Sequence, residues 1–281
     1  MLKLCRFLAK DQPRVGLYLP EGVADLSVKG FKSLTEILEN PSALRSISGA
    51  DLPGHKLGTI ELLAPVEQQE VWAAGVTYLR SKKARMEESE FSASAYDRVY
   101  EAPRPEIFFK SVGAKVSGAS GKVGIRADAK WNVPEPELAL VINSRKELVG
   151  FTVGNDMSSR DIEGENLLYL PQAKVYKHSC ALGPCITLGA TEAEARTWTI
   201  SVHIFRDGKD VFSGKTSVDQ IKRSFSELID YLWRSQEFPS GVVLLTGTGI
   251  VPGDDFTLQP ADRVRINISG IGSIENTVVE V

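Results

Sequence analysis

The chain has 281 residues, of which 42% are hydrophobic and 25% are charged, and its formal net charge is −3. This composition is ordinary for a globular protein of one large domain or two unequal ones, and it offers no basic surface for nucleic acid. No apolar run approaches the roughly 18 residues that cross a bilayer. Because the start lacks a signal-peptide pattern and the three cysteines form no CxxC pair, we expect a cytoplasmic protein without nucleic-acid or membrane partners.

The first 66 residues predict a small α/β domain. Residues 3–9 and 14–20 alternate between apolar and polar side chains, as the two strands of a hairpin do. Residues 33–36 (Ser-Leu-Thr-Glu) have the spacing of a capping box, which predicts the start of a short helix. We therefore expect a small N-terminal domain, residues 1–66, followed by a larger domain, residues 67–281.

The larger domain is expected to open with a strand at residues 70–76, which are small and β-favouring. Residues 79–101 are charged and helix-prone, and two interpretations remain open: an active-site lid or a surface helix packed on the body. Residues 104–110 then predict a short apolar strand that ends in Lys110.

Three acidic residues are predicted to converge in the middle of the chain. The run from Pro134 to Ile142 favours a strand, and a period of two puts Glu135 and Glu137 on one face. Residues 148–156 predict a second strand that brings Asp156 back beside the pair. Three carboxylates in a small volume repel one another unless a cation joins them, and all-oxygen ligation selects Mg²⁺ or Mn²⁺. The alternative is a strand end whose acids are solvated.

Cationic residues occur both before and after these acidic residues along the sequence. Helix-start signals at residues 158–161 follow the second strand directly. Gln172 and Lys174 are two residues apart and share one side if their segment is extended. We expect Lys110, Arg160 and Lys174 to be the cations near the three acids.

The C-terminal half is predicted to be strand-rich, with strands at 197–205, 210–214, 242–246, 262–269 and 272–279. Asp207-Gly208 between the first two is a hairpin signal. Apolar side chains at helical spacing predict an amphipathic helix over residues 218–235. Residues 247–249 (Gly-Thr-Gly) predict a turn where the backbone and the Thr248 hydroxyl meet a ligand carboxylate.

Four separated motifs arrive in an order that resembles the fumarylacetoacetate hydrolase family over residues 67–281. They are Glu135-Pro-Glu-Leu-Ala139, Gly154-Asn-Asp156 leading to Ser159-Arg-Asp161, Lys174, and Leu245-Thr-Gly-Thr-Gly-Ile-Val-Pro-Gly253. The resemblance implies an α+β, β-rich fold, a mixed β-sandwich roll, with one Mg²⁺ or Mn²⁺ per subunit of a homodimer or homotetramer. By motif it also implies the roles of six residues: metal ligands Glu135, Glu137 and Asp156, active-site lysine Lys174, and substrate contacts Arg160 and Gln172. Thr248 matches the threonine of the family's carboxylate-binding turn.

One departure separates this sequence from the hydrolases of the family, which carry a histidine after the first strand of this domain. Residues 75–84 contain none, and the only histidines are His55, His178 and His203. Residues 100–110 and 165–176 look most like the family's 2-keto-3-deoxy-pentonate dehydratase branch. This branch implies dehydration of a 2-keto-3-deoxy sugar acid to 2,5-dioxopentanoate. Alternatives are an acylpyruvate- or fumarylacetoacetate-type C–C hydrolase, a related hydratase, isomerase or decarboxylase, and a non-catalytic binding module.

A dehydration of this kind begins with loss of a C3 proton to give an enolate and continues with loss of the C4 hydroxyl. We expect Lys174 to be the C3 base, because burial and a cationic neighbour lower the pKa of a lysine. Its alternative role is an electrostatic contact to the enolate oxygen. Glu165 or another glutamate, from the lid or from residues 163–165, is expected to protonate the leaving hydroxyl, while Lys110 and Thr248 contact the substrate.

Overall fold

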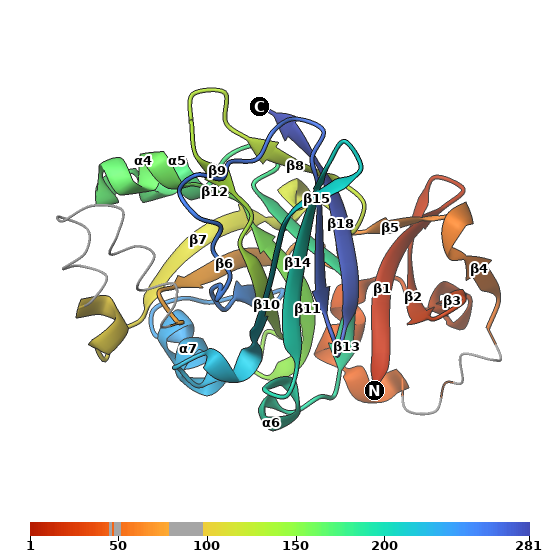
Figure 1. Cartoon of the computed structure of the whole chain (residues 1–281). Coiled ribbons are helices and arrows are strands. Elements are labelled where there is room, and N and C mark those ends of the chain that lie inside the picture. The colour runs from red at the N-terminus through yellow and green to blue at the C-terminus, as the bar shows by residue number, and fades with distance from the viewer. Residues whose placement is uncertain (45–46, 48–51, 79–97) are drawn as a thin grey trace.

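The structure is a computed structural model that describes residues 1–44, 47, 52–78 and 98–281. Two β-sheets pack against each other, and strands β14, β15 and β18 cross in front of β10, β11 and β13 in Figure 1. One apolar cluster joins the sheets, with Leu138 and Leu140 from one and Val202 and Ile266 from the other. The expected β-rich α+β fold, a mixed β-sandwich, is therefore confirmed.

The longer sheet has 11 strands and continues from the N-terminal segment into the centre of the molecule. Its order is β4 (Gly54–Lys56), β3 (Gly22–Asp25), β2 (Gln12–Leu19), β1 (Leu2–Ala9), β13 (Cys180–Leu188), β11 (Leu148–Asp156), β10 (Pro136–Ile142), β16 (Val242–Leu245), β6 (Glu70–Gly75) and β7 (Glu106–Val112), with β5 (Glu61–Leu63) also on β1. Strands β16 and β6 are parallel, and the other described neighbours are antiparallel.

The second sheet and the helices cover this long sheet. The sheet's order is β15 (Lys209–Ser217), β14 (Thr199–Arg206), β17 (Arg263–Ile268), β18 (Gly272–Glu280) and β8 (Lys122–Ile125), and β9 (Asn132–Val133) pairs separately with β12 (Ser158–Ser159). The α-helices that lie wholly within the described residues are α1 (Leu34–Glu39), α4 (Arg160–Glu165), α5 (Leu170–Lys174), α6 (Glu192–Ala195) and α7 (Phe225–Trp233). The 3₁₀ helices are η1 (Leu26–Lys29), η2 (Pro41–Leu44), η4 (Leu57–Thr59), η5 (Gly113–Lys115), η6 (Leu167–Tyr169) and η7 (Val218–Gln220). Within the described chain, every helix is too short or too polar to cross a membrane.

The N-terminal hairpin and helix form where the sequence predicts them. Strands β1 and β2 pair around a turn at Lys10 and Asp11, whose positive φ angles of 51° and 59° suit a tight hairpin turn. The Ser33 hydroxyl caps α1 by accepting from the Glu36 amide, whereas the Glu36 carboxylate accepts from Lys32. Strand β1 also pairs with β13, so the N-terminal strands extend the central sheet. The domain boundary after residue 66 stays a prediction, because the sheet runs through it.

Three local predictions differ from the structure. Strand β7 runs two residues past Lys110, so this lysine lies inside the strand instead of ending it. The helix expected from residue 218 begins only at Phe225, because the Ser224 hydroxyl caps it by accepting from the Glu227 amide. The segment with Gln172 and Lys174 is helical, so these side chains do not share one side. Most of the predicted lid, residues 79–97, lies outside the described residues.

Candidate active site

Glu135, Glu137 and Asp156 form a buried acidic cluster at the joined ends of β10 and β11. The strands are antiparallel with Pro136 opposite Asn155, and the Asp156 amide donates to the Glu135 carbonyl at 3.0 Å. This register places one carboxylate oxygen of each residue within 4.8 Å of the others. The side chains are buried, which removes the alternative of solvated acids at a strand end. The sequence-based expectation that the three converge is thus met by the geometry.

Three cations hold the acidic cluster from neighbouring elements. The Lys174 ammonium donates to Glu135 Oε2 at 2.8 Å and to Asp156 Oδ2 at 3.3 Å. Arg160 donates to Glu135 Oε1 at 2.9 Å from the first turn of α4. Lys110 pairs with the other Asp156 oxygen and also donates to the carbonyls of Met157 and Lys174. The cations expected near the acids therefore do lie there, in a site that water barely reaches.

Glu137 differs from the other two acids in its partners. Its Oε2 accepts from the Gly247 amide at 2.7 Å, and no cationic side chain in the described chain forms an ion pair with it. Burial raises the pKa of Glu137 well above its usual value, and the charges of Asp156 and Glu135 raise it further. A cation bound among the three carboxylates offsets both the cost of burial and the repulsion between the charges. The three carboxylate ligands therefore fit a hard divalent ion.

The Gly247-Thr248-Gly249 turn is built against the start of β10. Gly247 has a φ of +89°, and a Cβ there would lie 2.2 Å from Thr77 Oγ1, so the turn needs glycine. The buried Thr248 hydroxyl donates to the Pro136 carbonyl at 3.0 Å and accepts from the Ile250 amide at 3.2 Å. These bonds fix the turn beside the acids, and substrate contact by Thr248 stays a prediction.

Two predicted site residues lie away from the cluster. Gln172 is exposed on α5, and its carbonyl, not its side chain, accepts a hydrogen bond from Arg126 at 3.2 Å. Glu165 is exposed at the last position of α4. Helical geometry explains both placements, because residues two apart on a helix point in nearly opposite directions.

Two other glutamates line a cavity on the side of the cluster where α4 meets β7. Glu163 is buried one turn after Arg160 on the same face of α4, and Glu106 lies on β7. A Cβ on Gly75, the residue opposite Glu106 in β6, would lie 2.0 Å from Glu106 Oε2, so glycine makes room for this carboxylate. The cavity has a volume of about 280 Å³ and is lined by Val99, Arg104, Pro105, Glu106, Glu163, Leu167 and Leu170.

The face of β7 that carries Glu106 leads directly to the cluster. Residues 106 and 108 alternate onto one face, where the Phe108 ring lies 5.7 Å from the Lys174 nitrogen. Lys110 lies at an irregularity in the pairing of β7 with β6 and contacts Asp156. Sequence reasoning did not single out Glu106, which lies four residues before Lys110 on the same predicted strand. Glu163 was among the possible proton donors at residues 163–165, and its three-residue spacing after Arg160 is the signal that favours it over Glu165.

The three histidines all lie in the described chain, and none hydrogen-bonds to the acidic cluster. His203 pairs with Asp210 at 2.8 Å on the exposed β14–β15 hairpin. His55 lies 3.6 Å from Asp25. The His178 ring approaches the Ser117 hydroxyl at 3.5 Å in a different cavity. A histidine-activated water is therefore not part of this cluster.

Comparison with known proteins gives concordant matches. The family model described as "Fumarylacetoacetate (FAA) hydrolase C-terminal" matches residues 70–279. A "probable 2-keto-3-deoxyxylonate dehydratase" of Haloferax volcanii is 46% identical over 217 residues, 77% of this chain and 74% of the relative. A "2-dehydro-3-deoxy-D-arabinonate dehydratase" of Saccharolobus solfataricus is 35% identical, covering 98% of this chain and 95% of the relative.

One similar solved structure is described as 2-keto-3-deoxy-D-arabinonate dehydratase complexed with magnesium and 2,5-dioxopentanoate. It is 31% identical to this chain, covers 99% of both chains, and superposes with a TM-score of 0.87. The likeness therefore includes the N-terminal segment as well as the part matched by the family model.

Proposed function

This chain belongs to the fumarylacetoacetate hydrolase family, and we propose that it is a magnesium-dependent dehydratase that converts a 2-keto-3-deoxy sugar acid into 2,5-dioxopentanoate. The observation that carries the proposal is the buried cluster in which Lys174 bridges Glu135 and Asp156 beside Glu137. It occurs in a fold shared along its whole length with a dehydratase structure that holds magnesium and this product.

Glu135, Glu137 and Asp156 are the residues proposed to hold the ion. Their carboxylate oxygens are close together and buried, and Glu137 lacks a cationic partner in the described chain. When bound, Mg²⁺ supplies a positive centre for the keto acid and stabilises negative charge that develops on its C2 oxygen.

Lys174 is proposed to remove the C3 proton. Its ammonium is fully buried and held by Glu135, Asp156 and the Ser158 hydroxyl at 2.5 Å, which fixes its direction. Arg160 also pairs with Glu135 and Lys110 with Asp156, so both acids keep a cationic partner when Lys174 gives its proton to solvent. Lys174 in its neutral form can then accept the C3 proton.

The C4 hydroxyl leaves as water only if an acid protonates it. Glu106 and Glu163 share a cavity on the Lys174 side of β7, whereas Glu165 is exposed. We therefore assign the proton donor to the pair Glu106 and Glu163 in preference to Glu165. The proton from C3 ends on Lys174 and the C4–O bond breaks, which leaves a C3–C4 double bond conjugated with the C2 carbonyl. Loss of a proton from C5 and return of a proton to C3 then give the C4–C5 enol. This enol takes a proton at C4 and loses its hydroxyl proton to become the C5 aldehyde.

The direct test is an assay of purified protein with a panel of 2-keto-3-deoxy sugar acids, with and without Mg²⁺. Formation of 2,5-dioxopentanoate that requires Mg²⁺, followed by NMR, is the expected result. An acylpyruvate is assayed in parallel, because a C–C hydrolase would release two carbon fragments from it. Hydrolysis of the acylpyruvate without dehydration of any sugar acid would replace this proposal by the hydrolase alternative.

The finer features expected from the sequence remain part of the proposal. We propose two domains, residues 1–66 and 67–281, with a lid at residues 79–101, and a cytoplasmic homodimer or homotetramer. Exposed apolar side chains close to the site support subunit association, namely Leu168, which is 83% exposed, and Tyr169 and Val175, each 38% exposed. Light scattering after size exclusion measures the number of subunits.

A further inference from the structure

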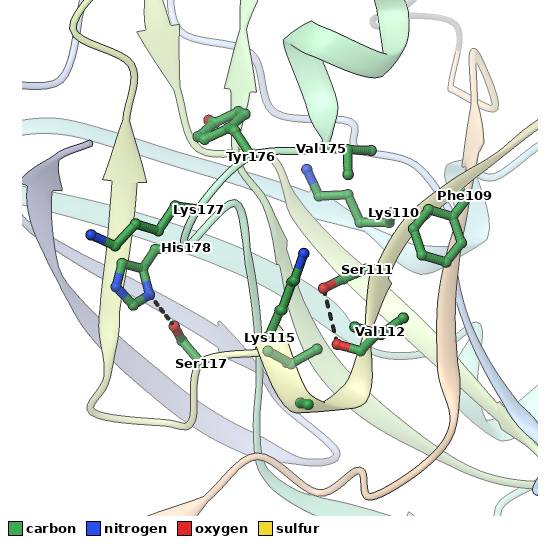
Figure 2. Close-up of a pocket in the computed structure, with 12 residues that line it drawn as sticks. Phe109, Lys110, Ser111, Val112, Lys115, Ser117, Val175, Tyr176, Lys177 and His178 are labelled. Atoms are coloured by element: carbon green, nitrogen blue, oxygen red, sulfur yellow. Dashed lines mark hydrogen bonds between the residues drawn. The ribbon is translucent and has the colours of Figure 1, made fainter.

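A second cavity lies on the far side of Lys110 from the acidic cluster. It has a volume of about 590 Å³ and is formed where β7 and η5 face the loop that follows Lys174. Figure 2 shows Lys115 extending from η5 into the middle of this cavity, with Ser111 on one side and His178 on the other. It is not the space proposed for the substrate, which lies along Glu106 and Glu163.

The lining of this cavity is basic and has no acidic counterpart. Among the 12 described residues that line it, three are lysines and none is aspartate or glutamate. Asp156 pairs with Lys110, but Lys115 and Lys177 form no ion pair with any described carboxylate. The Lys115 ammonium reaches into the cavity, and the Lys177 ammonium lies at its rim beyond His178, so two positive charges without a described carboxylate partner border the cavity, which favours an anion there.

His178 supplies a hydrogen-bonding group to the cavity, and apolar side chains form part of its walls. The residue has a φ of +58°, a left-handed conformation in which histidine, like asparagine and aspartate, is enriched. Its pKa is lowered by burial first and then by Lys177 and Lys122, so the ring is a neutral hydrogen-bonding group near neutral pH. Phe109, Val112, Val175 and Tyr176 supply apolar walls.

We propose that this cavity binds a second small molecule, an organic anion whose carboxylate or phosphate group meets Lys115 and Lys177 and whose carbon body lies on the apolar walls. The lysines supply charge-assisted hydrogen bonds, and Ser111, Ser117 and His178 supply neutral ones. The occupant would be separated from the acidic cluster by one side chain, since Lys110 lines the cavity and donates to the Lys174 carbonyl.

Calorimetric titration of the Mg²⁺-loaded protein at low ionic strength tests this proposal, with succinate and inorganic phosphate as separate probes. Saturable binding of at least one probe is expected, and the stronger probe identifies the carboxylate or the phosphate source. The double variant Lys115→Gln/Lys177→Gln should bind that probe at least tenfold more weakly, because each lysine contributes a charge-assisted contact. The control Lys29→Gln/Lys209→Gln removes the same charge from exposed positions elsewhere and should stay within twofold.

The variant Glu137→Gln tests whether the probe binds in this cavity or at the acidic cluster. The affinity of this variant for the probe should stay within twofold of that of the unsubstituted protein. Absence of saturable binding, equal losses in the two double variants, or loss of binding in Glu137→Gln would each overturn the proposal. Light scattering is measured on the same samples. A subunit number that changes in Lys115→Gln/Lys177→Gln but not in its control would assign the cavity to contact between copies, again overturning it.

Discussion

Replacing Lys174 by methionine separates a role as the C3 base from a role in holding the metal. The change removes hydrogen bonds to Glu135 at 2.8 Å, to Asp156 at 3.3 Å and to the Ser158 hydroxyl at 2.5 Å, yet Arg160 still pairs with Glu135 and Lys110 with Asp156. Because neither acid is left unpaired, the loss should be at least that of one hydrogen bond to a charged group, roughly 1.5–3 kcal/mol. For a chain of this size the melting temperature should fall by about 3–10 °C.

Turnover and metal binding should respond in opposite ways. Loss of a general base lowers turnover by about 10²- to 10⁴-fold. Mg²⁺ should bind at least as tightly as before, because the Lys174 ammonium no longer competes for oxygens of Glu135 and Asp156. Differential scanning fluorimetry reads this directly, since a ligand at about 100 times its Kd stabilises the folded state by about 2.7 kcal/mol.

The charge-conserving variant Lys174→Arg completes the experiment. Arginine keeps the positive charge but does not lose a proton, so it restores an electrostatic contact and not a base. Turnover should stay as low as in Lys174→Met. Recovery of turnover in Lys174→Arg, or turnover within tenfold of the original in Lys174→Met, would refute the base assignment, and loss of Mg²⁺ stabilisation in Lys174→Met would make the lysine part of the metal site.

Three further variants test the rest of the site. Glu137→Gln should lower both Mg²⁺ affinity and turnover by at least tenfold, measured by calorimetry and by the rate, because it removes an anionic oxygen from the cluster. Glu163→Gln should slow turnover more than Glu165→Gln at unchanged Mg²⁺ affinity, because the buried Glu163 is assigned to the proton donor and Glu165 is exposed. Equal effects of the two variants on turnover would contradict this assignment. Gly75→Ala should reduce kcat by displacing the Glu106 carboxylate, which its Cβ would approach at 2.0 Å. An unchanged kcat in Gly75→Ala would show that this placement is not needed.

Much of the cluster could be predicted because strands impose a simple rule on their side chains. The acids at 135 and 137 share a face by period two, and the turn after residue 142 returns the next strand antiparallel, so Asp156 reaches them. The hairpin at Asp207-Gly208 follows the same logic, since positive φ angles of 50° and 76° fit these two residues. The hairpin turn depends on the residues in the turn itself, and the shared face depends on the two-residue period of a strand. Both can be read from the sequence.

The predictions that differ from the structure concern segments whose conformation depends on tertiary contacts. Gln172 and Lys174 share one side only if residues 170–174 are extended, but Pro171 fits the first turn of α5, where its missing N–H costs nothing. The helix α7 starts late because Ser224 caps it and Ile221 instead bridges to Tyr78. The sequence does not choose between Glu163 and Glu165, because which carboxylate on α4 is buried depends on what packs against the helix.

The energetic cost of the cluster argues that stability alone does not explain it. Glu135, Glu137 and Asp156, with the cations Lys110 and Lys174, are each at most 3% exposed. Removing charges from water costs several kcal/mol per ion, which pairing repays only when the geometry is good, and apolar side chains of similar volume often give an equally stable core. The charges here are also unequally paired, since Lys174 bridges two acids while Glu137 meets only a backbone amide in the described chain. A purely structural network would be expected to pair Glu137 as well, so the imbalance is best explained by a cation that joins this carboxylate during function.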